Sequence, residues 1–411
     1  MILEVLVIGI LLTFAFDFLN GFHDAANAIA TIVATKVLTP VQAVGMAAVG
    51  NFVGMIFLTN AIAETIGTGI VEKSLFILDP SRPEAAALHA TAMILGGVLG
   101  AIVWNIITWV WGLPTSSSHA LIGGLVGSVV AAGAAGSVIV PSSQNILVFL
   151  LVTGAAFGAG AGTFTVVQRL RRETVSQGGV LIAGLLAGLL PSLFFGRLWL
   201  TGILKVVVFM VAAPLVGLIA AFGLTVLLLR LFRRTTPAKV NREFKRLQLL
   251  SSFFYSVTHG TNDAQKGMGI ITLLLLVAAV GPPWGPIAGT FVVPFWVILG
   301  AHASISIGTL FGGWRIVRTM AQRVTALRPY QGFAAETGGG IALAGTAFAG
   351  IPVSTTHVIS SAIMGVGATR RLSAVRWGVA RRIVGAWVLT IPAAGGVGAL
   401  CYLLLKVAFG V

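Results

Sequence analysis

The chain repeats one polar stretch, GFHDAAN at residues 21–27, as GTNDAQK at residues 260–266. A second polar stretch recurs in the same way, with PTSSSH at residues 114–119 and PVSTTH at residues 352–357. The two offsets are almost equal, 239 and 238 residues, when counted from Asp24 to Asp263 and from His119 to His357. Two polar islands therefore keep their spacing in two halves of the chain, which indicates an internal duplication whose site draws on both copies.

The composition around these islands is that of a membrane protein. The 411 residues are 57% hydrophobic and 9% charged, with a mean hydropathy of +1.00, whereas soluble domains carry about 25% charged residues. Only helices and closed barrels can span lipid. Apolar runs such as residues 88–111 are much longer than the roughly 10-residue alternating strands of a barrel. The expected fold class is therefore an all-α polytopic membrane protein.

The net charge of +15 comes largely from short basic clusters between the apolar runs. Clusters in that position follow the positive-inside rule, under which loops rich in Lys and Arg face the cytoplasm. We expect no nucleic acid partner, because basic loops between spans do not form a binding stripe. The single cysteine, Cys401, excludes an intrachain disulfide and a cage of cysteine ligands. The basic clusters occupy residues 169–172, 230–246, 315–328 and 370–382.

The most basic cluster, residues 233–246, carries Pro237 and is the natural seam between the halves. We expect a first inverted repeat at 1–172, central spans with a basic cytoplasmic loop at 173–246, and a second inverted repeat at 247–411. The first helix, residues 2–38, is expected to be interrupted at Asn20-Gly21. Further spans are expected at 40–66, 88–111, 118–140, 145–168, 180–195, 203–230, 247–280, 287–312 and 383–409.

One apolar run, residues 338–368, has an unusual length for its surroundings. It has 31 residues with Pro352 near the middle, and basic clusters flank it on both sides. That is too long for one span of about 20 residues and too short for two. The run is therefore expected to form a re-entrant hairpin with residues 352–357 at its tip.

The basic clusters also predict the orientation of the two halves. They place the N-terminus outside, Lys36 inside and the loop 67–87 outside, so the first half enters from outside and the second from inside. Opposite orientation of two copies is the inverted-topology repeat of many secondary transporters. The expected architecture has broken helices, two re-entrant hairpins and roughly 10–12 membrane segments.

The first island places a carboxylate inside a membrane span in each copy. Ionisable residues there are costly and tend to mark ion or substrate paths. A carboxylate beside amide oxygens suits a hard monovalent cation such as sodium, or carries a proton. The alternative is a cap at a helix break, without a ligand. The expected coupling-ion or proton site comprises Asp24, Asp263, Asn20, Asn27 and His23, with Asp24 and Asp263 forming any cation cage.

The second island places several hydroxyl groups at a hairpin tip in each copy. A helix that begins there presents unpaired N–H groups and the positive end of its dipole, which favours an anion. Two facing tips would surround a tetrahedral oxyanion with neutral donors. The alternative is ordinary N-capping by Ser or Thr. The hydroxyl groups belong to Thr115, Ser116, Ser117, Ser118, Ser354, Thr355 and Thr356.

The two copies of the first island are not identical. Asn262 stands where the first copy has His23, and Lys266 stands where it has Asn27. Lys266 either attracts an anion, substitutes for a cation in the second cage, or snorkels to a helix end. Asn262, Gln265 and Lys266 complete the expected substrate contacts. His119 and His357 are either proton carriers or bond neighbouring carbonyl groups.

At these residues the chain resembles the inorganic phosphate transporter (PiT) family, most closely its bacterial low-affinity branch. The Gly-x-Asn-Asp type signature appears in both halves, and the Pro-x-Ser-x-x-His islands also match. The resemblance covers nearly the whole chain. It implies proton-coupled uptake of phosphate as a neutral divalent-metal phosphate complex, by a homodimer in the cytoplasmic membrane. His23 and Lys266 depart from the family pattern, which argues against sodium coupling, and sulfate permeases share the architecture.

The expected function is secondary active symport of inorganic phosphate, without catalytic residues. The alternatives are sodium-coupled phosphate symport, a sulfate permease and a passive channel. An intramembrane metalloenzyme is a further class, but the chain lacks the ligand spacing of one. No Walker motif precedes a helix. No cofactor is expected beyond sodium or a divalent metal carried with phosphate.

Overall fold

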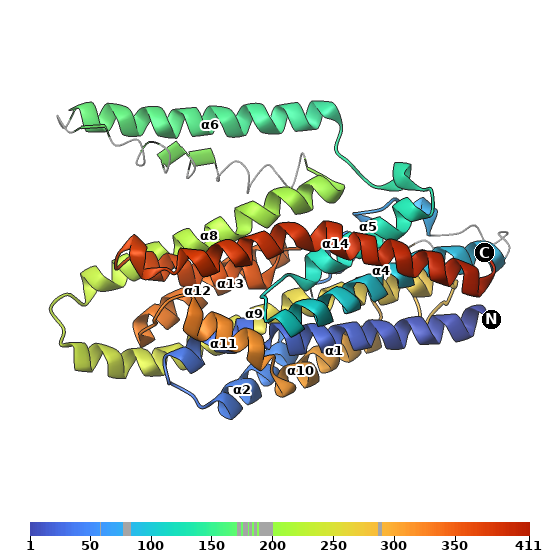
Figure 1. Cartoon of the computed structure of the whole chain (residues 1–411), viewed down its shortest axis with the longest axis horizontal. Coiled ribbons are helices and arrows are strands. Elements are labelled where there is room, and N and C mark those ends of the chain that lie inside the picture. Colours follow the sequence, from blue (N-terminus) through green and yellow to red (C-terminus); the bar gives the residue numbers. More distant parts are fainter. Residues whose placement is uncertain are drawn as a thin grey trace. The chain divides into compact units, whose positions relative to one another are not determined.

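The computed structural model describes residues 1–57, 59–76, 84–170, 200–286 and 290–411, and residues 174, 175, 180, 183, 184, 187 and 188. Regular structure in these residues is helical, apart from one isolated bridge between Val71 and Val138. The expected span at 180–195 lies mostly outside the described residues. The helices are α1 (Ile2–Ala34), α2 (Pro40–Val53), α3 (Ala61–Thr68), α4 (Glu84–Trp111), α5 (Ser117–Ala131), α6 (Ser143–Leu170), α8 (Gly202–Leu231), α9 (Pro237–Val277), α10 (Phe295–Phe311), α11 (Trp314–Arg323), α12 (Pro329–Phe348), α13 (Thr355–Ala368) and α14 (Trp377–Phe409), most of them labelled in Figure 1.

The chain divides into two compact units. The larger comprises residues 1–138 and 213–411, and the smaller comprises residues 139–212. Both polar islands lie in the larger unit, in both copies. The smaller unit contains α6, where Gly160 packs against Ala183 and Ala187.

Six described helices are long and apolar enough to cross a membrane, or seven if the bent pair α10 and α11 is one span. The hairpin arms α5, α12 and α13 and the long helix α9 fall outside that test because they are shorter or more polar. The all-α polytopic fold class is confirmed.

The expected interruption of the first helix at Asn20-Gly21 is wrong. Helix α1 runs without a break from Ile2 to Ala34, and α9 likewise runs through the second copy. Gly21 has a packing role instead, because a Cβ atom there would lie 2.1 Å from the backbone oxygen of Ile305. Gly260 approaches Asn51 in the same way, with its would-be Cβ 2.4 Å from a backbone oxygen. Both glycines permit close helix contact and break no helix.

The chain also departs from expectation in two of the basic clusters. Residues 237–246, expected as a loop, form the first turns of α9, because Pro237 occupies the first helical position, where its missing N–H costs nothing. Residues 315–323 of the cluster 315–328, also expected as a loop, belong to α11, which is bent by 72° from α10. The basic charge therefore lies largely on helix ends.

Both polar tips lie at the turns of helical hairpins. The first hairpin is α4 and α5, which turn at residues 112–116, and the second is α12 and α13, which turn at residues 349–354. The second confirms the hairpin expected from the 31-residue run, although its first arm already begins at Pro329. Gly112 and Gly350 take positive φ angles of 64° at the two turns, a conformation that glycine adopts without strain.

Small residues bring the helices of the larger unit into close contact. A Cβ atom at Gly100 would lie 2.7 Å from Gly398, and one at Gly127 would lie 2.0 Å from the backbone oxygen of Gly395. The first hairpin therefore packs directly on α14, beside which its arms lie in Figure 1. Gly338 meets the backbone of Ala221, so the triple-glycine run of α12 is also a packing surface.

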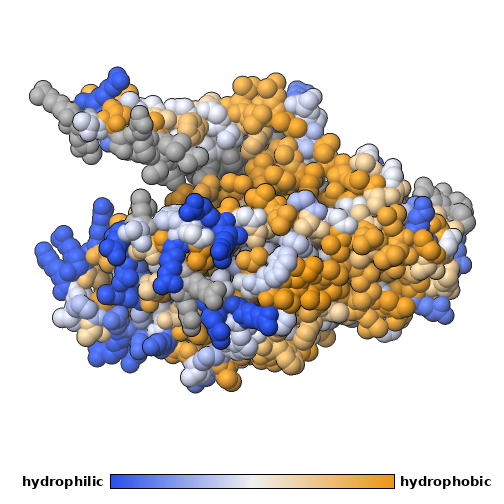
Figure 2. Space-filling model, viewed as in Figure 1, coloured by the Kyte–Doolittle hydropathy of each residue, from blue (hydrophilic) through white to orange (hydrophobic). Residues whose placement is uncertain are grey.

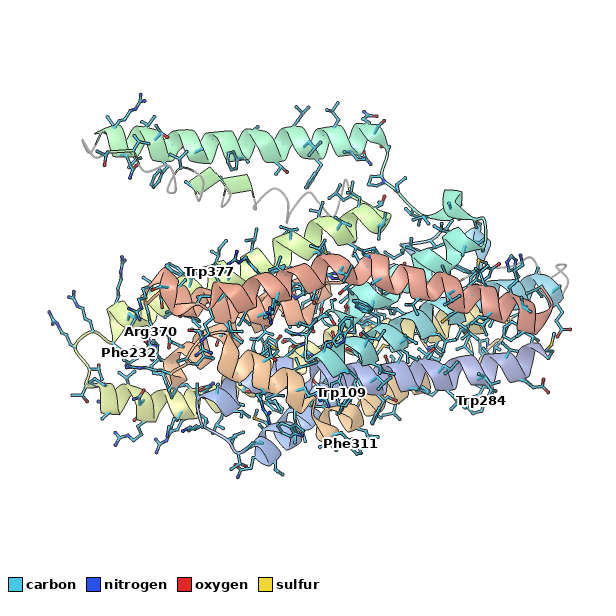
Figure 3. All side chains as sticks on the ribbon, viewed as in Figure 1. Trp109, Phe232, Trp284, Phe311, Arg370 and Trp377 are labelled. Carbon is cyan, nitrogen blue, oxygen red and sulfur yellow. The ribbon has the colours of Figure 1, made fainter. Side chains whose placement is uncertain are left out.

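The surface of the larger unit separates charge from apolar area. Figure 2 shows blue residues gathered at the end where α8 gives way to α9, and an orange surface over much of the remainder. Arg230, Arg233 and Arg234 are exposed at that end. Exposed Trp377 lies toward the same end, and exposed Trp284 lies toward the end that holds both termini (Figures 1 and 3). Aromatic residues near two ends of an apolar surface are typical of membrane interfaces.

Candidate functional site: two hairpin tips against two helices

The tips of the two hairpins touch each other inside the larger unit. Ser118 Oγ donates a hydrogen bond to the backbone oxygen of Val353 over 3.1 Å. The rings of His119 and His357 have their centroids 4.9 Å apart. Helix α5 begins at Ser117 and helix α13 at Thr355. The N-termini of two helices therefore meet, and their dipoles place positive partial charge in the same region.

One serine hydroxyl in each tip caps the helix that follows it. Ser116 Oγ accepts from the His119 backbone N–H over 3.2 Å, and Ser354 Oγ accepts from that of His357 at the same distance. This is the capping role that stood as the alternative to anion binding. Thr115 is tied into its own hairpin, because its Oγ1 donates to Thr108 Oγ1 over 2.9 Å.

Three other tip hydroxyls point at the carboxylates of the first island. Ser117 Oγ lies 3.3 Å from Asp24 Oδ2, and Thr356 Oγ1 lies 3.4 Å from Asp24 Oδ1. Thr355 Oγ1 lies 3.4 Å from Asp263 Oδ2. Asp24 thus receives a hydroxyl from both tips. The structure brings residues from α1, α5, α9 and α13 into one polar cluster.

Helix α1 presents its polar side chains to this cluster on one face. Asn20 Oδ1 accepts from Ser117, and Asn27 Nδ2 donates to Thr355 Oγ1 over 3.3 Å and to Thr356 Oγ1 over 2.9 Å. Positions 20, 24 and 27 share a face because they are about one helical turn apart. The amides thus bond the tips directly.

His23 extends the cluster toward the first hairpin. Its Nδ1 lies 2.7 Å from Asp24 Oδ1, and its Nε2 lies 3.2 Å from Thr108 Oγ1. Helix α4 supplies Thr108, so a histidine links the Asp24 carboxylate to an arm of the hairpin that carries Ser117. An imidazole beside a carboxylate can hold or pass a proton.

Asp263 has two basic neighbours on its own helix. Lys266 Nζ lies 2.8 Å from Asp263 Oδ1, and His259 Nε2 lies 3.3 Å from Asp263 Oδ2. Lys266 Nζ also lies 3.0 Å from Ser117 Oγ, where it donates a hydrogen bond. Asp24, His259 and Asp263 each offer a ligand atom within 4.8 Å of the others, a set that suits a metal cation.

Two expected substrate contacts serve the packing of α9 in this structure. Asn262 Nδ2 donates to the backbone oxygens of Thr258 and Leu343, over 2.8 and 3.1 Å. Gln265 Oε1 accepts from the backbone N–H groups of Ile62 and Ala63 at the start of α3. In the described part of the chain, neither amide forms a hydrogen bond with a tip hydroxyl.

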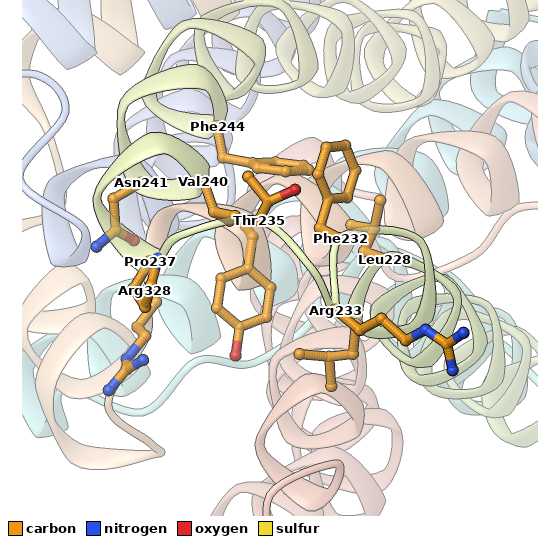
Figure 4. Close-up of a pocket in the computed structure, with 11 residues that line it drawn as sticks. Leu228, Phe232, Arg233, Thr235, Pro237, Val240, Asn241, Phe244 and Arg328 are labelled. Carbon is orange, nitrogen blue, oxygen red and sulfur yellow. The ribbon is translucent and has the colours of Figure 1, made fainter.

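All fifteen expected site residues are at most 3% exposed. A cavity of about 130 Å³ touches His23, and Asn105 and Trp109 are among its other lining residues. A larger surface cavity of about 180 Å³ lies where α8, α9 and α12 begin or end (Figure 4). Its lining is largely apolar and also includes Arg233, Thr235, Asn241 and Arg328. The larger cavity has none of the expected site residues in its lining.

Several buried groups were not among the expected site residues. His259 was signalled by the repeat, because it precedes Asp263 by the same four residues that separate Asn20 from Asp24. Tyr255 Oη donates to the backbone oxygen of Thr355 over 3.2 Å, and no pattern in the sequence pointed to it. Asp17 is fully buried, and a Cβ at Gly267 would lie 2.0 Å from its Oδ2.

Glu336 is a further buried carboxylate, set in α12 and away from the tip hydroxyls. Its Oε1 accepts from Thr31 Oγ1 over 2.6 Å and from Gln248 Nε2 over 3.0 Å, and its Oε2 accepts from Ser251 Oγ. Three neutral donors from α1 and α9 thus satisfy the carboxylate, and the network holds α12 against both helices.

Comparison with known proteins places the whole chain in one family. The family described as "Phosphate transporter family" matches residues 20–398. A probable low-affinity inorganic phosphate transporter of Rhizobium meliloti is 44% identical over 387 residues, covering 94% of this chain and 92% of that protein. One of Bacillus subtilis with the same description is 35% identical over 409 residues, covering 100% of this chain and 99% of that protein.

A solved structure described as "The sodium-dependent phosphate transporter" has a similar fold, with a TM-score of 0.66 and 24% sequence identity. The likeness covers 98% of this chain and 99% of that one. The relatives are named as transporters and not as enzymes, in agreement with the expectation from the sequence. From the family match and the apolar helices, this multi-pass membrane protein belongs to the phosphate transporter family.

Proposed function

We propose that this chain is a secondary active symporter that takes up inorganic phosphate, coupled to protons, through the cluster at the two hairpin tips. The main observation behind this proposal is that hydroxyl groups from both tips lie next to the two carboxylates. Ser117 and Thr356 contact Asp24, and Thr355 contacts Asp263. Hydroxyl groups and the N-termini of α5 and α13 supply neutral donors for a tetrahedral anion. The names of the relatives and of the family support phosphate as the substrate.

The same geometry supports coupling. Asp24 and Asp263 hydrogen bond to the hydroxyl groups that are proposed to hold the anion. A carboxylate and a phosphate charge about 5 Å apart repel by roughly 3 kcal/mol at an effective dielectric constant of 20. Phosphate therefore binds well only when a cation or proton neutralises the carboxylates. Binding of the two solutes is thereby linked, which is the requirement for symport.

Protons are favoured as the driving ion by the basic neighbours of the carboxylates. His23 lies 2.7 Å from Asp24, and His259 lies 3.3 Å from Asp263. Each carboxylate thus has an imidazole with which it can share a proton. Sodium is the second candidate, because the structure with a similar fold is that of a sodium-dependent phosphate transporter. Asp24 and Asp263 would then hold it, with Asn20 and Asn27 nearby.

The carried species is proposed to be a neutral complex of phosphate with a divalent metal. The cluster of Asp24, His259 and Asp263 supports this, because its carboxylate oxygens and imidazole nitrogen are ligand atoms that suit a divalent cation. The metal is cargo in this proposal. A sulfate permease is the alternative for the anion, since sulfate offers the same tetrahedral oxygens.

Further features follow from the duplicated motifs and the family resemblance. The two halves are proposed to be inverted repeats that rock around a fixed site in alternating access. The protein is proposed to lie in the cytoplasmic membrane, with its basic clusters facing the cytoplasm, and to act as a homodimer. The mass of the detergent-solubilised protein, corrected for bound detergent, tests the dimer.

Uptake into proteoliposomes tests the function. Radiolabelled phosphate should accumulate against its gradient when only a pH gradient is imposed, and excess sulfate should not compete. Strict dependence on sodium would select the sodium-coupled alternative, and preferential accumulation of sulfate would select the permease. Equilibration without accumulation would indicate a channel. Chemical conversion of substrate by the purified protein would indicate an enzyme.

A further inference from the structure

Lys266 is the residue at which the two copies of the first island differ in charge. It follows Asp263 by three residues, and the neutral Asn27 follows Asp24 by three. Lys266 is 2% exposed and lies within α9, which continues for eleven residues to Val277. Those residues correspond to about 16 Å of helix at 1.5 Å per residue. Lys266 is thus not a lysine that snorkels from a helix end.

The two residues nevertheless hold equivalent places. Asn27 donates to the hydroxyl groups of Thr355 and Thr356 in the second tip. Lys266 donates to the hydroxyl group of Ser117 in the first tip. Each side chain thus reaches from its own helix to the tip of the other copy. At the second position the neutral amide is replaced by a full positive charge.

The Lys266 ammonium is surrounded by groups that would ligate a free cation. Its Nζ lies 2.8 Å from Asp263 Oδ1 and 3.0 Å from Ser117 Oγ. Ser117 Oγ in turn lies 3.3 Å from Asp24 Oδ2. A carboxylate and a hydroxyl oxygen are ligands that a hard monovalent cation prefers, and an ammonium donates hydrogen bonds to the same oxygens.

We propose that the Lys266 ammonium is a tethered cation that occupies the coupling-cation position of the Asp263 copy. This inference rests on the proposed function. Lys266 neutralises Asp263 throughout the transport cycle, and its charge is not released with the substrate. Only the Asp24 copy then exchanges a cation or a proton with the surrounding solution.

Repulsion between the Lys266 ammonium and a sodium ion determines how strongly the lysine would prevent sodium from binding at Asp263. Two unit charges about 4 Å apart at an effective dielectric constant of 20 repel strongly enough to weaken the binding of a second cation by roughly a thousandfold. Removal of the ammonium should therefore open a sodium site at Asp263. Asparagine is the matched replacement, because it restores at position 266 the residue that the first copy carries.

The test uses equilibrium binding of radioactive sodium to the purified full-length protein, together with its melting temperature in sodium chloride and in choline chloride. Lys266→Asn should bind sodium roughly a thousandfold more tightly than the wild type, and sodium should raise its melting temperature. Lys266→Arg, which keeps the charge, should gain no sodium site. Lys245→Asn carries the same change at an exposed position of α9 and should behave as the wild type.

Adding Asp263→Asn to the Lys266→Asn variant should remove the new sodium site. A folded Lys266→Asn protein that gains no sodium binding would overturn the proposal. Wild-type sodium binding that Asp263→Asn abolishes would also overturn it, and this result does not depend on whether a Lys266 variant folds. Both measurements are independent of uptake, so this proposal and the symport mechanism can fail separately.

Discussion

Substitutions at positions 354 and 356 of the second tip should distinguish a hydroxyl group that contacts the substrate from one that only caps a helix. Thr356→Val removes a hydroxyl group that accepts from Asn27 over 2.9 Å and lies 3.4 Å from Asp24. Ser354→Ala removes the oxygen that accepts from the His357 backbone N–H. Both side chains are buried, so the two changes differ mainly in what the lost oxygen contacts.

The expected magnitudes follow from those contacts. A buried polar partner left without its hydrogen bond costs about 1–3 kcal/mol. If bound phosphate accepts a hydrogen bond from Thr356 Oγ1, Thr356→Val leaves a phosphate oxygen without a donor. The half-saturating phosphate concentration should then rise roughly tenfold to hundredfold. Loss of an N-cap costs about 0.5–2 kcal/mol of stability. Ser354→Ala should therefore melt at a lower temperature and keep its affinity for phosphate.

Phosphate binding and thermal melting of the same purified variants provide the readout. Thr356→Ser keeps the hydroxyl group and should retain most of the affinity. Ser117→Ala and Ser116→Ala repeat the comparison in the first tip, where Ser117 contacts Asp24 and Ser116 is the cap. Normal affinity with a lowered melting temperature in both Thr356→Val and Ser117→Ala would mean that these hydroxyl groups are structural and that the anion binds elsewhere.

Three further predictions concern coupling and packing. Asp24→Asn should abolish accumulation of phosphate while the protein remains inserted, because the Asp24 carboxylate must bind a cation or change protonation. Asp263→Asn should also abolish it, because the buried Lys266 ammonium would lose the carboxylate that lies 2.8 Å from it. Near-normal accumulation by either variant would refute the assignment of that aspartate. In sodium-free proteoliposomes an imposed pH gradient should drive accumulation of phosphate by the wild type, and a protonophore that collapses the gradient should stop it. Accumulation that continues in the presence of the protonophore would count against proton coupling. Gly21→Ala should strongly lower the melting temperature, because its Cβ would lie 2.1 Å from the Ile305 oxygen, whereas Gly45→Ala, with open space around it, should be close to neutral; equal melting temperatures for the two variants would contradict the packing role.

The features predicted correctly from the sequence are those that depend on local composition and length. The hydropathy of the apolar runs was sufficient to predict an α-helical membrane protein. In lipid the backbone N–H and C=O groups must bond one another, and runs of this length do so as helices. The 31-residue run around Pro352 predicted the second hairpin, because its length fits neither one span nor two. The paired motifs predicted that both tips and both aspartates belong together, since duplicated polar islands in lipid are costly without a shared role.

The break expected in the first helix shows where local signals mislead. Asn20-Gly21 is a common turn signal, but here the glycine allows α10 to approach α1, and the asparagine bonds Ser117 on the facing tip. Tertiary contacts satisfy the polar side chain within an intact helix. No local pattern distinguishes that role from a helix break.

The roles of individual side chains were decided only by the tertiary structure. The tip motifs contain hydroxyl groups in a row, yet Ser116 and Ser354 cap their helices while Ser117, Thr355 and Thr356 face the aspartates. Neighbouring residues on a helix point about 100° apart, so the direction of each depends on how the hairpins pack. The sequence by itself determined which chemical groups enter the membrane and that they occur in two copies. The packing of α1, α5, α9 and α13 decided which of them meet, because hydrogen bonds and ion pairs require contact within a few ångströms.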